Sequence, residues 1–312
     1  MAKRSVKSAK QTRAKPPAEL LSIVDFARYA ATQFARAKLS YGQGTDDAIG
    51  DAVLLVCAAL DIEVESFEAF ATARLTAEER NRIFGLIETR IRTRKPVPYL
   101  VNRVYMRGVP FYVDERTIIP RSFIGEIMQS ELFSGDEAAL MMPENVERVL
   151  DLCTGSGCIA ILAASSFPNA TIDAVDISKD ALTVAAVNVR DHGLQDRIRL
   201  VHGDLFKPLK GERYDLILTN PPYVDAMGMA ALPKEFRYEP PGALDGGADG
   251  IKIVRTIIDE APRHLTPDGG MLCEVGRGRE VVESAWPQLN FLWLDTLNSS
   301  GEVFWIAAND LE

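Results

Sequence analysis

The feature that most constrains the fold of this chain is a regular alternation, after residue 145, of short apolar runs and helix-length segments. The runs have the character of buried β-strands and occupy residues 147–152, 171–176, 198–202, 214–219, 270–275, 291–296 and 302–308. Such alternation is typical of a mostly parallel sheet covered by helices on both faces, so we predict an α/β fold. Only a short turn, 298–301, joins the last two runs, which predicts a hairpin and an antiparallel strand at the sheet edge.

The sequence before residue 99 has a helical character. Apolar residues recur with nearly the period of a helix between residues 19 and 38. Thr45 or Asp46 is suited to cap a second helix, which ends near residue 60, and the capping box Thr76–Glu79 predicts the start of a third.

Two short β-like runs, 104–106 and 111–113, then predict a hairpin, and a helix is expected over about 122–133. We therefore divide the chain into four segments. They are a disordered basic tail (1–17), a helical substrate-recognition domain (18–98), a β-hairpin linker (99–121) and a cofactor-binding catalytic domain (122–312).

The charge of the chain is unevenly distributed. The net charge is −9, but residues 1–17 hold six basic and no acidic residues, so the rest of the chain carries −15. An acidic body disfavours a protein whose main task is to bind nucleic acid. We interpret the tail as a solvated arm, with contact to RNA and an organelle transit peptide as alternatives.

Several other classes of protein are disfavoured by what the sequence lacks. No apolar run is long enough to cross a bilayer, and no apolar stretch typical of a signal peptide precedes Pro16. The four cysteines form no C-x-x-C pair, and the three histidines are scattered. The sequence thus predicts a cytoplasmic protein with no membrane partner and no metal site.

Residues 149–160 have the pattern of a strand, a glycine turn and the start of a helix, with Gly155 and Gly157 in a G-x-G-x-x-A motif. Such a turn lets a ligand approach the backbone, and it binds dinucleotides and adenosyl cofactors alike. Asp176 and Asp204 end the next two apolar runs, where carboxylates can accept hydrogen bonds from ribose hydroxyls and an adenine amino group. The candidate cofactor-binding residues are Asp151, Thr154, Gly155, Gly157, Asp176, Asp204 and Asn220.

The run 214–219 leads directly into Asn220, Pro221, Pro222 and Tyr223, which are the candidate catalytic residues. Proline has no N–H, so this segment offers backbone carbonyls and the Asn220 side-chain oxygen as acceptors for an NH2 group. The Tyr223 ring can lie against a planar π system. These properties suit methyl transfer from S-adenosyl-L-methionine to a planar amide or exocyclic amine nitrogen.

Two other functions remain open on these residues. A nucleic-acid amino methyltransferase would use the same acceptors, although the acidic body and the lack of an aromatic, basic stripe speak against it. A cofactor-binding assembly factor without turnover would need the glycine turn but not the Asn220–Tyr223 segment.

Taken together, these motifs resemble the class I, Rossmann-like methyltransferases that act on glutamine side-chain amides, the protein-glutamine N-methyltransferases. That family modifies peptide release factors and a large-subunit ribosomal protein. Two stretches, residues 41–46 and 111–122, resemble the branch that acts on large-subunit ribosomal protein L-three. The resemblance implies N5-methylation of a glutamine in that protein, with release factors as the alternative substrate.

The resemblance also implies roles for individual residues. Gly155 and Gly157 would approach the methionine and ribose portions of S-adenosylmethionine, and Asp176 and Asp204 would hold the ribose and the adenine. Residues 220–223 would bind the glutamine amide. In addition, Arg121 is expected to close the site or to form a surface ion pair, and the Gly/Pro-rich stretch 239–247 to be a lid or a connection.

Overall fold

The computed structural model describes residues 15–133 and 139–311, which form two compact units. The first unit comprises the residues up to Leu39 together with Asp47–Val97. The second comprises Ser40–Asp46 and the chain from Pro98 onward, so the short segment 40–46 groups with the sheet rather than with the helices that flank it in sequence. The predicted basic tail lies outside the described residues except for residues 15–17, and the predicted domain limits stay predictions.

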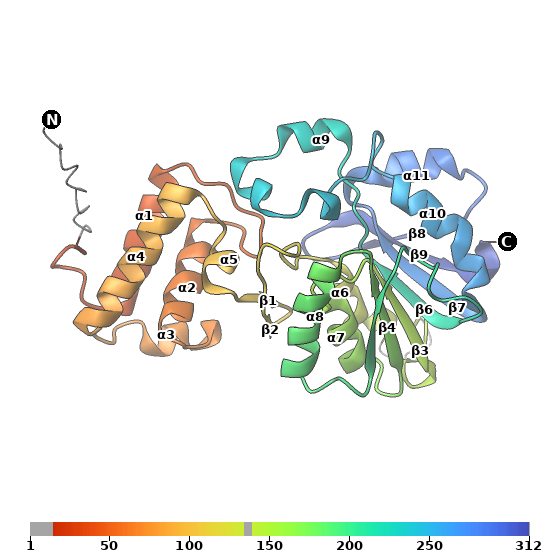
Figure 1. Cartoon of the computed structure of the whole chain (residues 1–312), viewed down its shortest axis with the longest axis horizontal. Coiled ribbons are helices and arrows are strands. Elements are labelled where there is room, and N and C mark those ends of the chain that lie inside the picture. Colours follow the sequence, from red (N-terminus) through yellow and green to blue (C-terminus); the bar gives the residue numbers. More distant parts are fainter. Residues whose placement is uncertain (1–14, 134–138, 312) are drawn as a thin grey trace, which may run out of the picture. The chain divides into compact units, whose positions relative to one another are not determined.

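The first unit is helical (Figure 1), with helices α1 (Ile23–Arg36), α2 (Ala48–Ala59), α3 (Phe67–Phe70) and α4 (Ala77–Thr93). The capping box predicted for α4 is present, because Thr76 and Glu79 each accept a hydrogen bond from the backbone N–H of the other. The predicted cap of α2 was wrong by one or two residues. Asp47, rather than Thr45 or Asp46, accepts two N–H groups of the first turn.

The second unit contains a two-stranded hairpin and a seven-stranded sheet with the order β5-β4-β3-β6-β7-β9-β8. The hairpin was predicted, but its second strand covers 109–111 rather than 111–113, because Arg107 and Gly108, both with positive φ, form the whole turn. Its strands are β1 (Val104–Met106), β2 (Val109–Phe111), β3 (Arg148–Leu152), β4 (Thr171–Asp176), β5 (Ile198–His202), β6 (Tyr214–Thr219), β7 (Leu265–Glu274), β8 (Leu292–Asp295) and β9 (Ser300–Ala307). Its helices are α5 (Val97–Val101), which begins at the boundary, α6 (Ile124–Met128), α7 (Cys158–Ser166), α8 (Lys179–Asp191), α9 (Ala226–Ala231), α10 (Lys252–Glu260) and α11 (Arg279–Ala285).

The predicted α/β fold with a mostly parallel sheet is confirmed. Strands β5, β4, β3, β6 and β7 pair in parallel, whereas β9 pairs antiparallel with both β7 and the edge strand β8. The predicted terminal hairpin therefore supplies the antiparallel edge of the sheet, and β9 is the strand of the seven that runs against the others.

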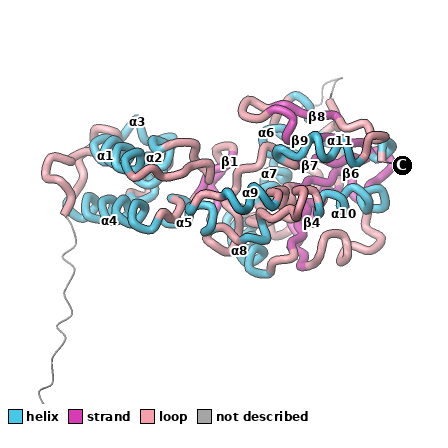
Figure 2. The backbone as a smooth tube through the Cα atoms, turned by 90° about the horizontal axis from the view of Figure 1, so that it is seen from above, coloured by secondary structure: helices cyan, strands magenta, loops and turns pink. Residues whose placement is uncertain are grey.

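Helices cover both faces of the sheet (Figures 1 and 2). Successive side chains of a strand point to opposite faces, so each strand contributes to two cores. In β9, Val303 and Trp305 pack in the core that contains α6 and α7, and Phe304 and Ile306 pack in the core that contains α10. In the described parts of the chain, no helix combines the length and the apolar character that crossing a bilayer requires.

Helix α6 is shorter than the predicted helix 122–133, because it ends at Met128 and is followed by a separate turn, Glu131–Phe133. The reason is local. The Ser130 hydroxyl donates to the Ile127 carbonyl at 2.7 Å and accepts from the Leu132 N–H at 3.3 Å, so it takes hydrogen bonds that a continuous helix would need.

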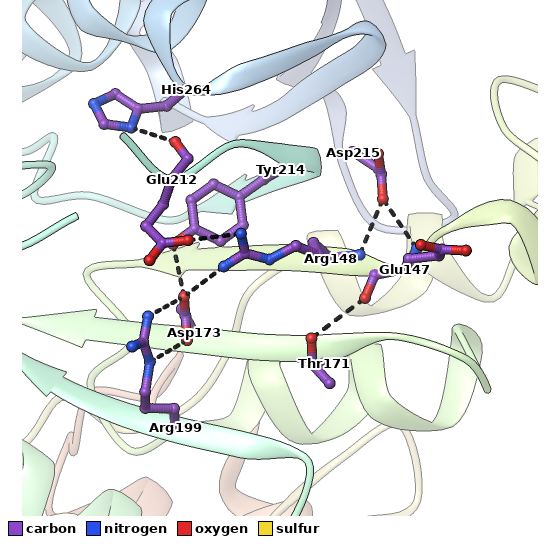
Figure 3. Close-up of polar contacts among 9 residues, drawn as sticks. All are labelled: Glu147, Arg148, Thr171, Asp173, Arg199, Glu212, Tyr214, Asp215 and His264. Carbon is purple, nitrogen blue, oxygen red and sulfur yellow. Dashed lines mark hydrogen bonds and ion pairs between the residues drawn. The ribbon is translucent and has the colours of Figure 1, made fainter. Parts of the chain in front are cut away.

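A network of charged side chains lies near the amino ends of the central strands (Figure 3). The Asp173 carboxylate accepts from Arg199 Nε and Nη2 at 2.7 and 2.6 Å and from the Tyr214 hydroxyl at 2.6 Å. Arg148 lies 3.4 Å from the same carboxylate and stacks 4.8 Å above the Tyr214 ring. Burial alone would raise the pKa of Asp173, but the hydrogen bonds from Arg199 and Tyr214 outweigh it and hold the pKa below its ordinary value.

Replacing Asp173 with Asn should lower the free energy of unfolding by about 1–3 kcal/mol, because its hydrogen-bonding partners lose a shared charged acceptor. The folded-state pKa of Asp173 lies below the unfolded value of about 3.9, so its contribution is complete at neutral pH and is lost as the pH falls through the folded-state pKa. Denaturant unfolding of wild type and variant, at neutral pH and in acid, measures both effects. The control D191N alters an exposed ion pair with Arg190 and should change the free energy of unfolding by less than about 0.5 kcal/mol. Equal losses of stability in D173N and D191N would contradict the stabilising role of Asp173.

Candidate active site

The candidate site lies at the carboxyl ends of the strands, at the point where the strand order reverses. From β3 the chain continues to β4 on one side, whereas β6 lies on the other side. Open α/β sheets form a crevice at such a switch point. Here the crevice holds a cavity of about 480 Å³, which is lined by the segments after β3, β4, β5 and β6 and by residues 116–122.

The turn after β3 has an unusual backbone, with Cys153, Gly155 and Gly157 in the left-handed region at φ of 60°, 58° and 79°. A Cβ at Gly155 would lie 3.2 Å from the hydroxyl oxygen of Thr117, so glycine keeps the space above the turn open. A Cβ at Gly157 would lie 3.2 Å from that of Ala185 on α8, so this glycine allows close helix packing.

Asp151 and Gly157, both predicted to bind the cofactor, are not among the described residues that line the cavity. The Asp151 carboxylate is buried and accepts from the Thr154 hydroxyl at 2.5 Å and from the Ala160 N–H at 3.1 Å, which ties the two ends of the turn together. Burial raises its pKa to about 7 against the effect of these hydrogen bonds. In place of ligand contact, we propose that both residues shape the turn.

The other predicted cofactor residues, Thr154, Gly155, Asp176, Asp204 and Asn220, all line the cavity. Asp176 is fixed by the N–H groups of Gly155 and Ser178 at 2.9 and 2.8 Å, and burial raises its pKa despite these bonds. Asp204 pairs with Lys207 at 2.5 Å, but both side chains are exposed, so a ligand can replace this pair at little cost.

The segment Asn220–Tyr223 follows β6, and all four residues line the same cavity. The Thr219 hydroxyl at the end of β6 donates to the Leu152 carbonyl at the end of β3, at 3.0 Å. This bond fixes the end of one strand against the end of the other. The structure therefore brings together the two groups of residues that the sequence singled out.

Tyr223 is held on several sides. Its hydroxyl donates to Glu274 Oε1 at 3.0 Å. A Cβ at Gly246, Gly250 or Gly276 would come within 2.7, 2.7 and 2.6 Å, respectively, of atoms of this tyrosine. Because only glycine leaves that space, the backbone encloses Tyr223 closely.

Arg121 pairs with a buried carboxylate, and its own side chain is 24% exposed, so the pair is not the predicted surface one. Its Nη1 and Nη2 donate to Glu239 at 2.6 and 2.9 Å, and Glu239 also accepts from the Ile119 N–H at 3.0 Å. Glu239 is 2% exposed and belongs to the Gly/Pro-rich stretch that the sequence left as a lid or a connection. Pro240 and residues 242–244 of this stretch line the cavity, so it forms one wall of the site.

Sequence reasoning missed Glu274, the last residue of β7. Its Oε2 accepts from the Ser122 hydroxyl at 2.7 Å and from the Phe123 N–H at 2.9 Å, and the residue is 1% exposed. Burial raises its pKa to about 6 against the effect of its hydrogen bonds. A lone acid inside the apolar run 270–275 was the available signal.

Asn188 on α8 was also missed. Its side chain accepts from the Tyr112 N–H at 2.7 Å and donates to the carbonyls of Tyr112 and Ser156 at 3.0 and 2.8 Å. It thus joins the segment that follows β2 to the glycine turn. In the sequence Asn188 is a polar residue within a helix, and no pattern around it indicated this contact.

An adenosyl cofactor fits this cavity. Along the strand ends β5, β4, β3 and β6 the wall presents Asp204, Asp176, the Gly155 turn and Asn220 in that order. The two carboxylates suit an adenine amino group and ribose hydroxyls, and the glycine turn leaves room for an amino-acid portion. The Thr117 hydroxyl is buried opposite this turn and has no hydrogen-bond partner in the described part of the chain, as expected of a polar atom that a ligand completes.

Comparison with known proteins identifies the family. The family model of the methyltransferase small domain matches residues 136–236. A ribosomal protein uL3 glutamine methyltransferase from Bradyrhizobium diazoefficiens is 60% identical over 296 residues, which are 94% of this chain and 93% of that protein. Proteins of the same name from Burkholderia pseudomallei and Bordetella pertussis are 47% and 44% identical, over 95% and 94% of this chain and 97% of each relative.

The chain belongs to the family of ribosomal protein uL3 glutamine methyltransferases. The predicted family and its branch are thereby confirmed. So are the predicted activity class, a methyltransferase, and the predicted methyl donor, S-adenosylmethionine.

The variant D176N should bind S-adenosylhomocysteine about 10- to 100-fold more weakly than the wild type, because a charged acceptor for the ribose hydroxyls is lost. Isothermal titration calorimetry with S-adenosylhomocysteine measures this. The control D180N changes an exposed carboxylate in the first turn of α8 and should bind normally. Unchanged affinity in D176N would remove Asp176 from the cofactor site.

Proposed function

We propose that this chain transfers the methyl group of S-adenosylmethionine to the side-chain amide nitrogen of a glutamine in large-subunit ribosomal protein uL3. The observation that carries this proposal is the presence of Asn220–Tyr223 in one cavity with the glycine turn of β3. Relatives that bear this name and match nearly the whole chain support the choice of substrate.

The chemical problem is that an amide nitrogen is a poor nucleophile, because its lone pair is delocalised into the carbonyl group. The Asn220 side-chain oxygen and the Pro221 carbonyl would each accept one N–H of the substrate NH2 group, which fixes its plane and favours electron density on nitrogen. The Tyr223 ring would pack against that plane. Orientation and preorganised dipoles then supply most of the rate.

S-adenosylmethionine supplies an electrophilic methyl group on a sulfonium. The residues that would hold it are Thr154, Gly155, Asp176 and Asp204, with Asp176 accepting from the ribose hydroxyls and Asp204 from the adenine amino group. Asn220 lies at the next strand end beyond the glycine turn. It would therefore orient the substrate amide beside the methionine portion of the donor.

The setting of the reaction completes the proposal. We infer that the protein acts on uL3 in the cytoplasm. The basic tail stays a predicted solvated arm, with contact to RNA as an alternative, and residues 1–14 of this tail lie outside the described residues. Release factors and nucleic-acid amino groups are the competing substrates, and the assay below separates them.

Replacing Asn220 with Ala should lower kcat for uL3 by at least about 100-fold, because one of the two acceptors for the substrate NH2 group is lost. Binding of S-adenosylhomocysteine should remain measurable by calorimetry. The assay follows labelled methyl transfer from S-adenosylmethionine to purified uL3. The control N290A alters an exposed asparagine before β8 and should be fully active.

The same assay is run with a release factor, and with ribosomal fractions treated with nuclease. Label in uL3 that survives nuclease treatment and maps to one glutamine by mass spectrometry supports the proposal. Label confined to the release factor, or lost with nuclease, would move the substrate to another class.

A further inference from the structure

Glu274 is a buried acid for which the mechanism above has no use. It lies at the carboxyl end of β7, is 1% exposed and is not among the described residues that line the cavity. Its two oxygens face different segments: Oε1 accepts from the Tyr223 hydroxyl, and Oε2 accepts from the Ser122 hydroxyl and the Phe123 N–H. It therefore bridges the catalytic segment and the opposite wall of the cavity.

The Tyr223 hydroxyl has one proton, and it is donated to Glu274. It thus has no second proton for a substrate, and the part of the side chain left to face the cavity is the ring. Gly276 lies against the ring itself, since a Cβ there would come within 2.6 Å of Tyr223 Cε2, and this restricts the positions that the ring can take. A phenol O–H prefers to lie in the plane of its ring, so the bond to Glu274 Oε1 favours one orientation of that plane.

The electrostatic surroundings of Glu274 make its buried negative charge unfavourable. Burial disfavours the charged form of Glu274, Glu302 on β9 acts in the same direction, and the hydrogen bonds from Ser122 and Tyr223 only partly compensate, so the pKa rises to about 6. Arg121 is the nearby positive charge that acts on Tyr223. Ser122 and Phe123 need an acceptor in any case, but the bond from Tyr223 is not required for that, because phenylalanine at 223 would fill the same space. A cost of this kind is expected where the geometry of one side chain matters for function.

We propose that Glu274 is a positioning residue for methyl transfer, which fixes the ring plane of Tyr223 so that its face, and not its hydroxyl, meets the substrate amide. This inference rests on the function proposed above. The Tyr223 ring is then a rigid surface against which the substrate amide packs, and Glu274 holds that ring in position.

The test is a double-mutant cycle on kcat with E274Q, Y223F and the double variant, using uL3 and S-adenosylmethionine. The Phe123 N–H can only donate, so a glutamine would turn its oxygen toward it and its NH2 group toward Tyr223. The bond from the Tyr223 hydroxyl to a carboxylate oxygen is then lost. Each single variant should lower kcat by about 10- to 100-fold, as expected for misplacement of a catalytic wall. The double variant should be no slower than the slower single variant, because both remove the same interaction.

Two further measurements separate positioning from a general structural role. The Kd for S-adenosylhomocysteine and the KM for uL3 should stay within about twofold in both single variants, since the ring face and the cofactor residues are still present. The control E302Q changes the other acid near Glu274 and should leave kcat unchanged. Additive losses in the cycle, or equal weakening of cofactor binding, would overturn the inference.

If E274Q does not fold, the Y223F variant is sufficient for the test. A fall in kcat with unchanged KM and Kd supports the inference, and a kcat equal to that of the wild type refutes it. Failure of the proposed function looks different, because the wild type itself would then leave uL3 unmethylated.

Discussion

One wall of the site has no secondary structure of its own, and two buried carboxylates hold it in place. The segment from Ile119 to Phe123 lies between the hairpin and α6 in the sequence and belongs to no helix or strand, and its residues up to Ser122 line the cavity. Glu239 accepts from the first of these residues and Glu274 from the last. Buried backbone donors must be satisfied, so the shape of the cavity depends on these two acids.

The opposite wall is built in another way. There the parallel strands β3 and β6 end side by side, and their ends place the glycine turn and Asn220–Tyr223 next to each other. Sheet hydrogen bonds make that side rigid, and the buried Asp151 carboxyl ties the turn after β3. The site thus joins a wall built on strand ends to a wall held by two buried carboxylates, and the Tyr223 hydroxyl connects the two walls through its hydrogen bond to Glu274.

The difference between these walls explains what could be predicted. Strand positions, the glycine turn and Asn220–Tyr223 follow from local patterns, because alternation, glycine and proline act over a few residues. The place of Asp151 could not be predicted, since a carboxylate after a strand can point to a ligand or back into its own turn, and packing decides. Glu274 was missed because its partners lie 51, 151 and 152 residues away in the sequence. Asn188 was missed because its partners lie 32 and 76 residues away.

The grouping of segment 40–46 with the sheet bears on how such a protein can be divided. The chain leaves the helical unit after Leu39, returns at Asp47 and leaves again after Val97, so three connections join the two units. A cut before Pro98 would also remove the Ser40 N–H, which donates to the buried carboxylate of Glu235 at 2.9 Å. The catalytic unit is therefore not a cassette that could be exchanged intact at a single junction. A recombination that exchanged the catalytic unit between relatives would also have to exchange the segment 40–46.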